Sequence, residues 1–246
     1  MNSKAIILDL SGTGYVAAKC LGEQDIDVVG VHTTKYEPIA HQSRYLSKSI
    51  VEPFGSYERT LEILLEEAKS FDEKGVLFIA SDPMVEFASK FYEELSEQYH
   101  VPHSTKYDIA KSMSKQEMAR IASRAGLNVP QNISLSKDGD YDAVIEQARF
   151  PSFVKPETSL QGYKDMMGIA YTRDQLHELI HEKFNFCNDL LVSEYIPGNV
   201  ESLYETHAFS NADGTAFTPA AIQKLRQHPD MLVGSGTFLQ TVDDDK

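Results

Sequence analysis

The chain has 246 residues, of which 41% are hydrophobic and 24% charged, which is ordinary for a globular protein and long enough for two domains. Its formal net charge of −14 argues against nucleic acid or an anionic membrane as the main partner, because both require a basic surface. No apolar run approaches the ~18 residues of a membrane helix. Cys20 and Cys187 are too few for a disulfide framework, so we expect reduced thiols in a cytoplasmic protein.

Predicted strands and helices alternate through the first part of the chain. Apolar runs at 4–10, 27–31 and 75–80 predict buried parallel strands, and apolar side chains between 57 and 70 recur at helical spacing. Such alternation forms a parallel sheet with right-handed crossovers. We therefore expect a Rossmann-like α/β domain over residues 1–108.

A glycine-containing turn follows the first predicted strand. Gly12, Gly14 and Ala17 have the G-x-G-x-x-A spacing of a dinucleotide-binding turn. The second strand, however, ends in Val-His-Thr at 31–33, where NAD-binding proteins place an acidic residue for the ribose. We favour a structural or substrate-binding role for Gly12 and Gly14, and an NAD-dependent oxidoreductase is the least favoured alternative.

Ser81 and Asp82 follow the third predicted strand. They stand at the carboxyl edge of the sheet, where ligands of open α/β sheets bind, and are candidates for a substrate site. Capping of the helix that begins near Pro83 is the alternative, and the sequence favours it.

Residues 109–246 are expected to form a second, α+β domain. A helix over 114–125 is followed by alternating strands and helices, which predicts a small lobe over about 127–196. The last helix of this lobe begins with a capping box, in which Thr172 stands three residues before Gln175.

A β-hairpin is predicted in the last part of the chain. Two β-prone runs, at 202–209 and 215–223, flank the sequence Asn-Ala-Asp-Gly at 211–214. Asp-Gly between such runs is a strong signal for a tight turn, because glycine accepts a positive φ. We expect another lobe to start within 197–246.

Two lysines stand in settings suited to phosphate. Lys155 ends a short apolar strand, and the loop after Pro156 contains Gly162, so that backbone N–H groups can approach an anion. Lys115 lies in the first turn of a predicted helix, where a cation opposes the helix dipole and gains from an anionic ligand. Lysine supplies a compact charge for phosphate. Simple exposure to solvent is the alternative for each lysine.

In order and spacing, these two segments and Asp-Leu-Leu-Val-Ser-Glu-Tyr-Ile-Pro-Gly at 189–198 resemble the ATP-grasp superfamily of carboxylate–amine ligases. The likeness is greatest to the carbamoyl-phosphate-synthase-like and D-aspartate-ligase-like branch, and it is sharpest between Ala110 and Gly198. It implies a Rossmann-like pre-ATP-grasp domain followed by an α+β ATP-grasp domain that is incomplete at its C-terminus. It also implies an ADP-forming enzyme that activates a small carboxylate, such as an amino acid, as an acyl phosphate for attack by an amine.

The resemblance assigns the phosphate-binding residues. Lys115 and Lys155 would bind the phosphates of ATP from two sides. Ser159 and Gly162 would form the flexible loop over the β- and γ-phosphates. Many members of the superfamily have adjacent glycines in this loop, whereas this chain has Ser-Leu-Gln-Gly, which implies a stiffer lid or a weaker site.

The resemblance also assigns the remaining contacts to ATP and substrate. Glu194, Tyr195 and Ile196 would form the hinge that meets adenine through the backbone. Glu201 would accept hydrogen bonds from the ribose hydroxyls, with a solvated turn carboxylate as the alternative. Arg226 would be the catalytic residue that meets the γ-phosphate or the substrate carboxylate, with an ordinary surface arginine as the alternative.

ATP and Mg²⁺ are the implied cofactors, and small carboxylates and amines the implied partners, with a homodimer also allowed. No E-x-N motif of the kind that holds Mg²⁺ in this superfamily follows Gly214, so we expect the metal ligands outside this chain. A truncated ATP-grasp module that binds nucleotide without catalysis is therefore an open alternative. We expect no zinc site among the eight histidines.

Overall fold

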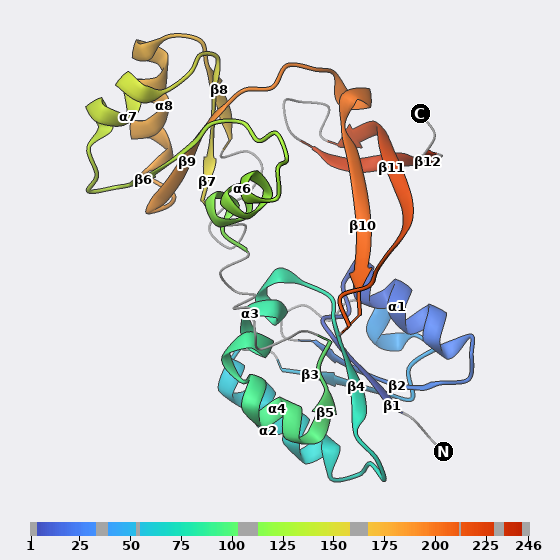
Figure 1. The fold of residues 1–246 in the computed structure, drawn as a ribbon. Helices are drawn as coiled ribbons and strands as arrows, with labels where there is room; N and C mark the ends of the chain where they lie inside the picture. Colours follow the sequence, from blue (N-terminus) through green and yellow to red (C-terminus); the bar gives the residue numbers. More distant parts are fainter. Residues whose placement is uncertain are drawn as a thin grey trace. The chain divides into compact units, whose positions relative to one another are not determined.

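A computed structural model describes residues 4–32, 39–52, 55–102, 113–157, 167–211, 213–228 and 234–242. Its contacts divide the chain into two compact units, residues 1–114 and 115–246 (Figure 1). The predicted boundary between residues 108 and 109 lies outside the described residues and stays a prediction.

The first unit contains the predicted parallel sheet, with five strands in the order β3-β2-β1-β4-β5, of which β3 and β5 were not predicted. Its strands are β1 (Lys4–Leu8), β2 (Asp27–His32), β3 (Lys48–Val51), β4 (Gly75–Ile79) and β5 (Tyr99–His100). Its helical segments are α1 (Gly12–Gly22), η1 (Ile39–Gln42), α2 (Tyr57–Ala68), α3 (Asp82–Lys90) and α4 (Tyr92–Gln98).

Both faces of this sheet are covered by apolar side chains. Successive residues of a strand point to opposite faces, so β1 contributes Ile6 and Leu8 to one core and Ala5 and Ile7 to another. The first core packs against α2, α3 and α4, and the second against α1, where Ala18 is fully buried. Burial on both faces accounts for the continuous apolar runs in the sequence.

The second unit begins with α6 (Lys115–Arg124) and continues as a four-stranded antiparallel sheet in the order β6-β9-β7-β8. Its other elements are β6 (Asn132–Ser136), α7 (Tyr141–Gln147), β7 (Ser152–Pro156), β8 (Gly168–Ala170), α8 (Arg173–Lys183) and β9 (Asp189–Glu194). The Thr172 hydroxyl accepts a hydrogen bond from the Gln175 N–H at 3.2 Å, as the predicted helix cap requires.

One face of this sheet packs against α7 and α8. Val154, Leu190 and Val192 form a core there with Leu176 and Ile180 of α8. Residues that alternate with these on the strands point to the other face. Lys155 of β7 is one of them, since it alternates with the buried Val154 and Pro156.

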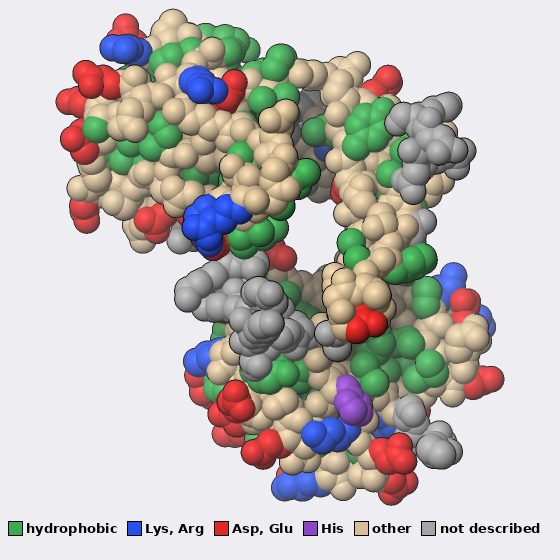
Figure 2. All heavy atoms as spheres, in the orientation of Figure 1, with side chains coloured by type: hydrophobic (Ala, Val, Ile, Leu, Met, Phe, Trp, Pro, Cys, Tyr) green, Lys and Arg blue, Asp and Glu red, His purple; other side chains and the backbone are tan. Residues whose placement is uncertain are grey.

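A three-stranded antiparallel sheet follows η4 (Val200–Ser202) and consists of β10 (Tyr204–Ser210), β11 (Ala216–His228) and β12 (Ser235–Val242). The predicted hairpin between β10 and β11 is confirmed, with Gly214 at φ +87° and the Asn211 N–H bonded to the Thr215 carbonyl at 2.8 Å. Every residue of β10 is exposed. Figure 2 shows hydrophobic side chains on the visible surface of this sheet. The largest exposed ones are Tyr204, Phe209, Phe217 and Phe238.

Candidate functional site

Lys115 and Lys155 come together where α6 begins and β7 ends. The Lys115 Nζ donates to the carbonyls of Pro156 at 3.1 Å and Glu157 at 3.3 Å, directly after Lys155. Burial, and after it the charge of Lys115, lowers the pKa of the Lys155 ammonium, while the charge of Glu157 opposes the shift. The two ammonium groups therefore repel each other, and an anion that met both would relieve that repulsion.

Glu157 fixes the first turn of α6 to the sheet. Its carboxylate accepts hydrogen bonds from the Gln116 N–H at 3.2 Å and from the Ser134 hydroxyl of β6 at 2.9 Å. Lys155 makes no ion pair within the described residues, and its recorded contact is with the ring of Phe153, 5.6 Å from Nζ to the centroid. The charge of Lys155 is thus held close to Lys115 and open to an anionic ligand.

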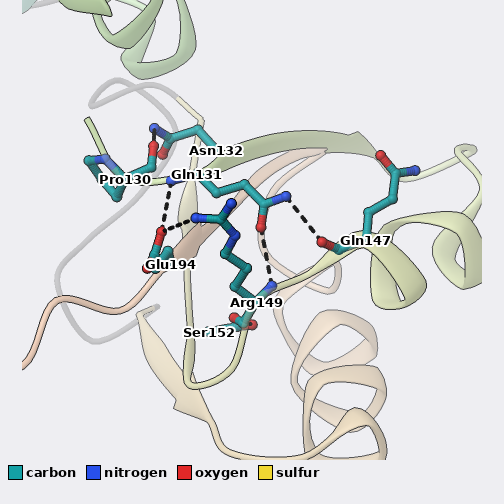
Figure 3. Close-up of polar contacts among 7 residues, drawn as sticks. All are labelled: Pro130, Gln131, Asn132, Gln147, Arg149, Ser152 and Glu194. Atoms are coloured by element: carbon teal, nitrogen blue, oxygen red, sulfur yellow. Dashed lines mark hydrogen bonds and ion pairs between the residues drawn. The ribbon is translucent and has the colours of Figure 1, made fainter. Parts of the chain in front are cut away.

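The predicted adenine hinge starts at the last residue of β9, and three of its hydrogen-bonding groups bind the protein itself. The Glu194 carboxylate accepts from the Arg149 guanidinium at 3.2 Å and the Gln131 N–H at 3.3 Å (Figure 3). The backbone N–H groups of Glu194 and Tyr195 donate to the carbonyls of Gln131 and Pro151, each at 2.9 Å. The Glu194 side chain therefore anchors the strand end to the segment before β6.

Ile196 keeps a backbone donor for a ligand. Its N–H has no hydrogen-bond partner within the described residues, and its side chain is 63% exposed. The Ile196 N–H and the neighbouring carbonyls are thus the groups of the predicted hinge that can form hydrogen bonds with the edge of a planar ring.

Glu201 and Arg226 lie in the part of the second unit that contains η4 and the three-stranded sheet β10-β11-β12. Glu201 is exposed in η4, and its carbonyl accepts a hydrogen bond from the Gln223 side chain at 2.8 Å. Arg226 is exposed on β11, with its guanidinium 5.9 Å from the ring centroid of Phe238. No recorded contact among the described residues joins either residue to the lysine pair. Ser159 and Gly162 lie outside the described residues.

The predicted substrate residues lie in the first unit, at the carboxyl edge of its sheet. Gly12 lines an open cavity of about 850 Å³, whose wall also includes Ser11, Tyr15, Arg44 and Tyr45. Gly14 has a packing role instead, because a Cβ there would lie 1.8 Å from the Asp9 carbonyl oxygen.

Ser81 and Asp82 occupy the start of α3. Ser81 is its N-cap residue, although its side chain makes no capping hydrogen bond, and Asp82 is its first residue. Neither lines the cavity beside Gly12 as the structure describes it. Helix initiation, the favoured alternative in the sequence, fits their position, and a substrate role for them stays a prediction.

The expectation of no zinc site overlooked one spacing. His177 and His181 stand four residues apart on α8, and their Nε2 atoms are 3.2 Å apart. A His-x-x-x-His spacing in a segment predicted to be helical is a sequence signal for this proximity, because residues i and i+4 share a face. Among the described residues, no group of three or more His, Cys, Asp or Glu side chains is placed to hold a metal ion.

The fold is shared with solved structures of several enzymes. An L-amino acid ligase from Bacillus licheniformis matches with a TM-score of 0.69 at 14% identity, over 95% of this chain and 53% of that one. An N5-carboxyaminoimidazole synthetase from Staphylococcus aureus, complexed with ADP, matches with a TM-score of 0.66 at 14% identity, over 93% and 56%. The chain has the ATP-grasp fold.

A third structure agrees with the first two. The biotin carboxylase domain of a 2-oxoglutarate carboxylase from Hydrogenobacter thermophilus, in complex with MgADP, ADP and bicarbonate, matches with a TM-score of 0.69 at 15% identity, over 92% and 51%. This chain therefore spans about half the length of these ATP-grasp structures. No protein-family model and no curated protein matches the sequence. In the part of the chain that the structure describes, no helix has both the length and the apolar character to cross a membrane.

Proposed function

We propose that this chain is the nucleotide-binding part of an ATP-dependent, ADP-forming carboxylate–amine ligase. The observation that carries the proposal is the lysine pair, in which Lys115 donates hydrogen bonds to the end of β7 directly after Lys155, and burial, followed by the charge of Lys115, lowers the pKa of Lys155. Two ammonium groups held together against their repulsion are suited to a polyanion such as a triphosphate. The ATP-grasp fold supports the same assignment, because two of the similar structures contain adenine nucleotides.

The nucleotide would lie with its phosphates at Lys115 and Lys155 and its adenine at the end of β9. The sheet favours this placement, because Lys155 of β7 pairs directly with Leu191 of β9, five residues before Ile196. Adenine can then accept a hydrogen bond from the Ile196 N–H and donate its amino group to a carbonyl of the hinge. Ser159, Gly162, Glu201 and Arg226 stay as proposed contacts to the phosphates, ribose and substrate.

The proposed reaction has two steps. A carboxylate oxygen of the substrate attacks the γ-phosphorus, the bond to the β-phosphate oxygen breaks, and ADP leaves. An amine then attacks the acyl phosphate carbon, inorganic phosphate departs with the bonding electrons, and the amine loses a proton to give the amide. Lys115 and Lys155 would stabilise the negative charge that accumulates on the phosphate oxygens in the first step.

In such a ligase a bound Mg²⁺ would supply positive charge that neutralises part of the charge of the phosphates. Carboxylates are the ligands that Mg²⁺ prefers, and the described residues offer no group of three candidate ligands. Within the described residues, the proposed positive charge at the phosphates comes from Lys115 and Lys155, with Arg226 as a further proposed contact.

A small carboxylate, such as an amino acid, is the substrate class that we propose. The similar structures include an L-amino acid ligase and a biotin carboxylase domain with bound bicarbonate, which supports a small carboxylate. The cavity beside Gly12 is large enough for a molecule of this size.

An inert nucleotide-binding module is the second candidate. The lysine pair supports it equally, because two ammonium groups can bind the phosphates of ATP without catalysing a reaction. Such a module would bind ATP through the same lysines and would form no ADP.

Calorimetric titration with ATP, ADP and NAD⁺ in the presence of Mg²⁺ tests the site, and ADP release across a panel of amino acids and amines tests the reaction. We expect ATP and ADP to bind and NAD⁺ not to bind. Absence of ATP binding would overturn both candidates. ATP binding without ADP release for any pair of substrates would favour the inert module over the ligase.

A further inference from the structure

The outer surface of α8 carries two histidines that the proposed function does not use. His177 and His181 are both exposed, and they lie one helical turn apart between the buried residues that anchor α8 to the sheet. The helix packs on the face of the sheet that carries Val154, whereas Lys155 points to the other face. The histidine pair is therefore separate from the lysine pair.

The distance between the two rings matches that of a chelating pair. The Nε2 atoms are 3.2 Å apart, and the ring centroids are 4.4 Å apart. If each Nε2 were bound to one metal ion at about 2.0–2.1 Å, the angle at the metal would be roughly 100–106°. This value lies between the right angle of a square-planar or octahedral site and the tetrahedral angle, so the distance between the two nitrogens is compatible with both rings binding one ion in place of the hydrogen bond between them.

The surroundings of the pair hold one ring in place. Tyr141 of α7 meets the His181 ring edge-on, with centroids 5.1 Å apart, and it stacks on Phe184 at 5.3 Å. The Tyr141 hydroxyl donates to the Lys137 carbonyl at 2.6 Å, which fixes the tyrosine in turn. The His181 ring therefore has less rotamer freedom to lose when it binds an ion.

We propose that His177 and His181 form a binding site for a divalent transition-metal ion on α8. Imidazole nitrogen suits Cu²⁺, Ni²⁺ and Zn²⁺, and the affinity for nitrogen donors should be greatest for Cu²⁺ and negligible for Mg²⁺. Water would complete the coordination, because no third His, Cys, Asp or Glu ligand stands with the pair among the described residues.

The sequence around the pair, His-Glu-Leu-Ile-His, also has the spacing of zinc hydrolases. A catalytic zinc takes three protein ligands, and the described residues supply two. The histidine pair therefore supports binding of an ion and lacks the third ligand that hydrolysis needs among the described residues.

Isothermal titration of the untagged protein with CuCl₂, NiCl₂, ZnCl₂ and MgCl₂, with thermal melts, tests the proposal. His177→Gln and His181→Gln should each lower the affinity of the tightest transition-metal binding step by at least about tenfold. Loss of a residue that only supports a metal ligand already lowers metal affinity about 10–100-fold. A transition metal should also raise the melting temperature of the wild type, because the unfolded chain does not hold the two rings together.

Two matched variants sharpen the test. His207→Gln removes an exposed histidine from β10 and should leave this metal-binding step unchanged. The double variant Glu178→His with His181→Gln keeps two histidines on α8 but places them at adjacent positions, which do not face each other. This double variant should lose the metal-binding step. Equal binding by this double variant and the wild type, or no binding by the wild type, would overturn the proposal. Retention of ATP binding by all of these variants would show that the two sites are independent.

Discussion

Lys155→Ala is expected to weaken ATP binding while leaving the fold intact. In the free protein the Lys155 charge is partly buried, is repelled by Lys115 and makes no ion pair within the described residues. Alanine therefore removes an unfavourable interaction from the free protein, and the melting temperature should stay the same or rise. In the complex, alanine removes a charge-assisted contact with phosphate, worth about 1.5–3 kcal/mol.

That loss corresponds to a fall in ATP affinity of roughly 10- to 150-fold, at ~1.4 kcal/mol per factor of ten. Calorimetric titration of the wild type and the variant measures it. Lys137→Ala is the matched control, because Lys137 is an exposed lysine of the same unit and should leave the affinity unchanged. Lys155→Arg should also weaken binding, since a planar guanidinium does not replace a compact ammonium group. An unchanged affinity in Lys155→Ala would refute the phosphate assignment, and a marked fall in its melting temperature would refute the argument about repulsion.

The pH dependence follows from the direction of the pKa shift. The pKa of Lys155 lies below its ordinary value of 10.5 in the free protein, and phosphate binds its protonated form. As pH rises through the lowered pKa, the ammonium group is lost, so ATP affinity should fall at lower pH than an ordinary lysine would allow. Lys155 has the opposite effect on the stability of the free protein. As pH increases from the lowered pKa toward 10.5, the free energy of unfolding rises, because the unfolded chain has the higher pKa and holds the proton longer. Titrations at several pH values should show this fall in the wild type and not in Lys155→Ala.

Two further predictions separate structural from ligand-binding roles. Glu194→Gln should lower the melting temperature slightly, because the partly exposed ion pair with Arg149 is worth at most about 1 kcal/mol. The variant should leave ATP affinity unchanged. A large loss of affinity would instead indicate that the Glu194 carboxylate contacts the nucleotide. Gly14→Ala should destabilise the first unit by about 1–3 kcal/mol in chemical denaturation, because its Cβ would collide with the Asp9 carbonyl, whereas Gly12→Ala, with nothing within 4 Å, should be tolerated. Equal effects of the two alanine substitutions would contradict this account.

The elements whose pattern is local were predictable from the sequence. The parallel strands of the first unit are apolar because both faces of the sheet are buried, and Gly214 takes the positive φ that the predicted hairpin turn requires. The cap of Thr172 on Gln175 is likewise set within four residues. In each case the determinant lies within one turn or strand, so no tertiary information is needed.

The details of the site depend on contacts between distant segments. The G-x-G spacing does not distinguish Gly12 from Gly14. The position of the Asp9 carbonyl in the structure shows that Gly14 lacks room for a side chain, whereas Gly12 has it. Similarly, the Glu194 carboxylate accepts a hydrogen bond from Arg149, 45 residues away. This contact depends on tertiary packing, so the sequence near Glu194 contains no signal for it. The resemblance to a family assigned Lys115 and Lys155 to the same phosphates, but the hydrogen bonds from Lys115 to the end of β7, across 41 residues, have no signal in either segment alone.

The three-stranded sheet of the second unit has a consequence for how the protein behaves in solution. Its outer strands, β10 and β12, each pair with β11, and their side chains are almost entirely exposed. An exposed strand edge that carries aromatic side chains such as Phe209 and Phe238 is a template for pairing with another chain. Self-association should therefore grow with protein concentration, and light scattering should detect it well before either unit unfolds.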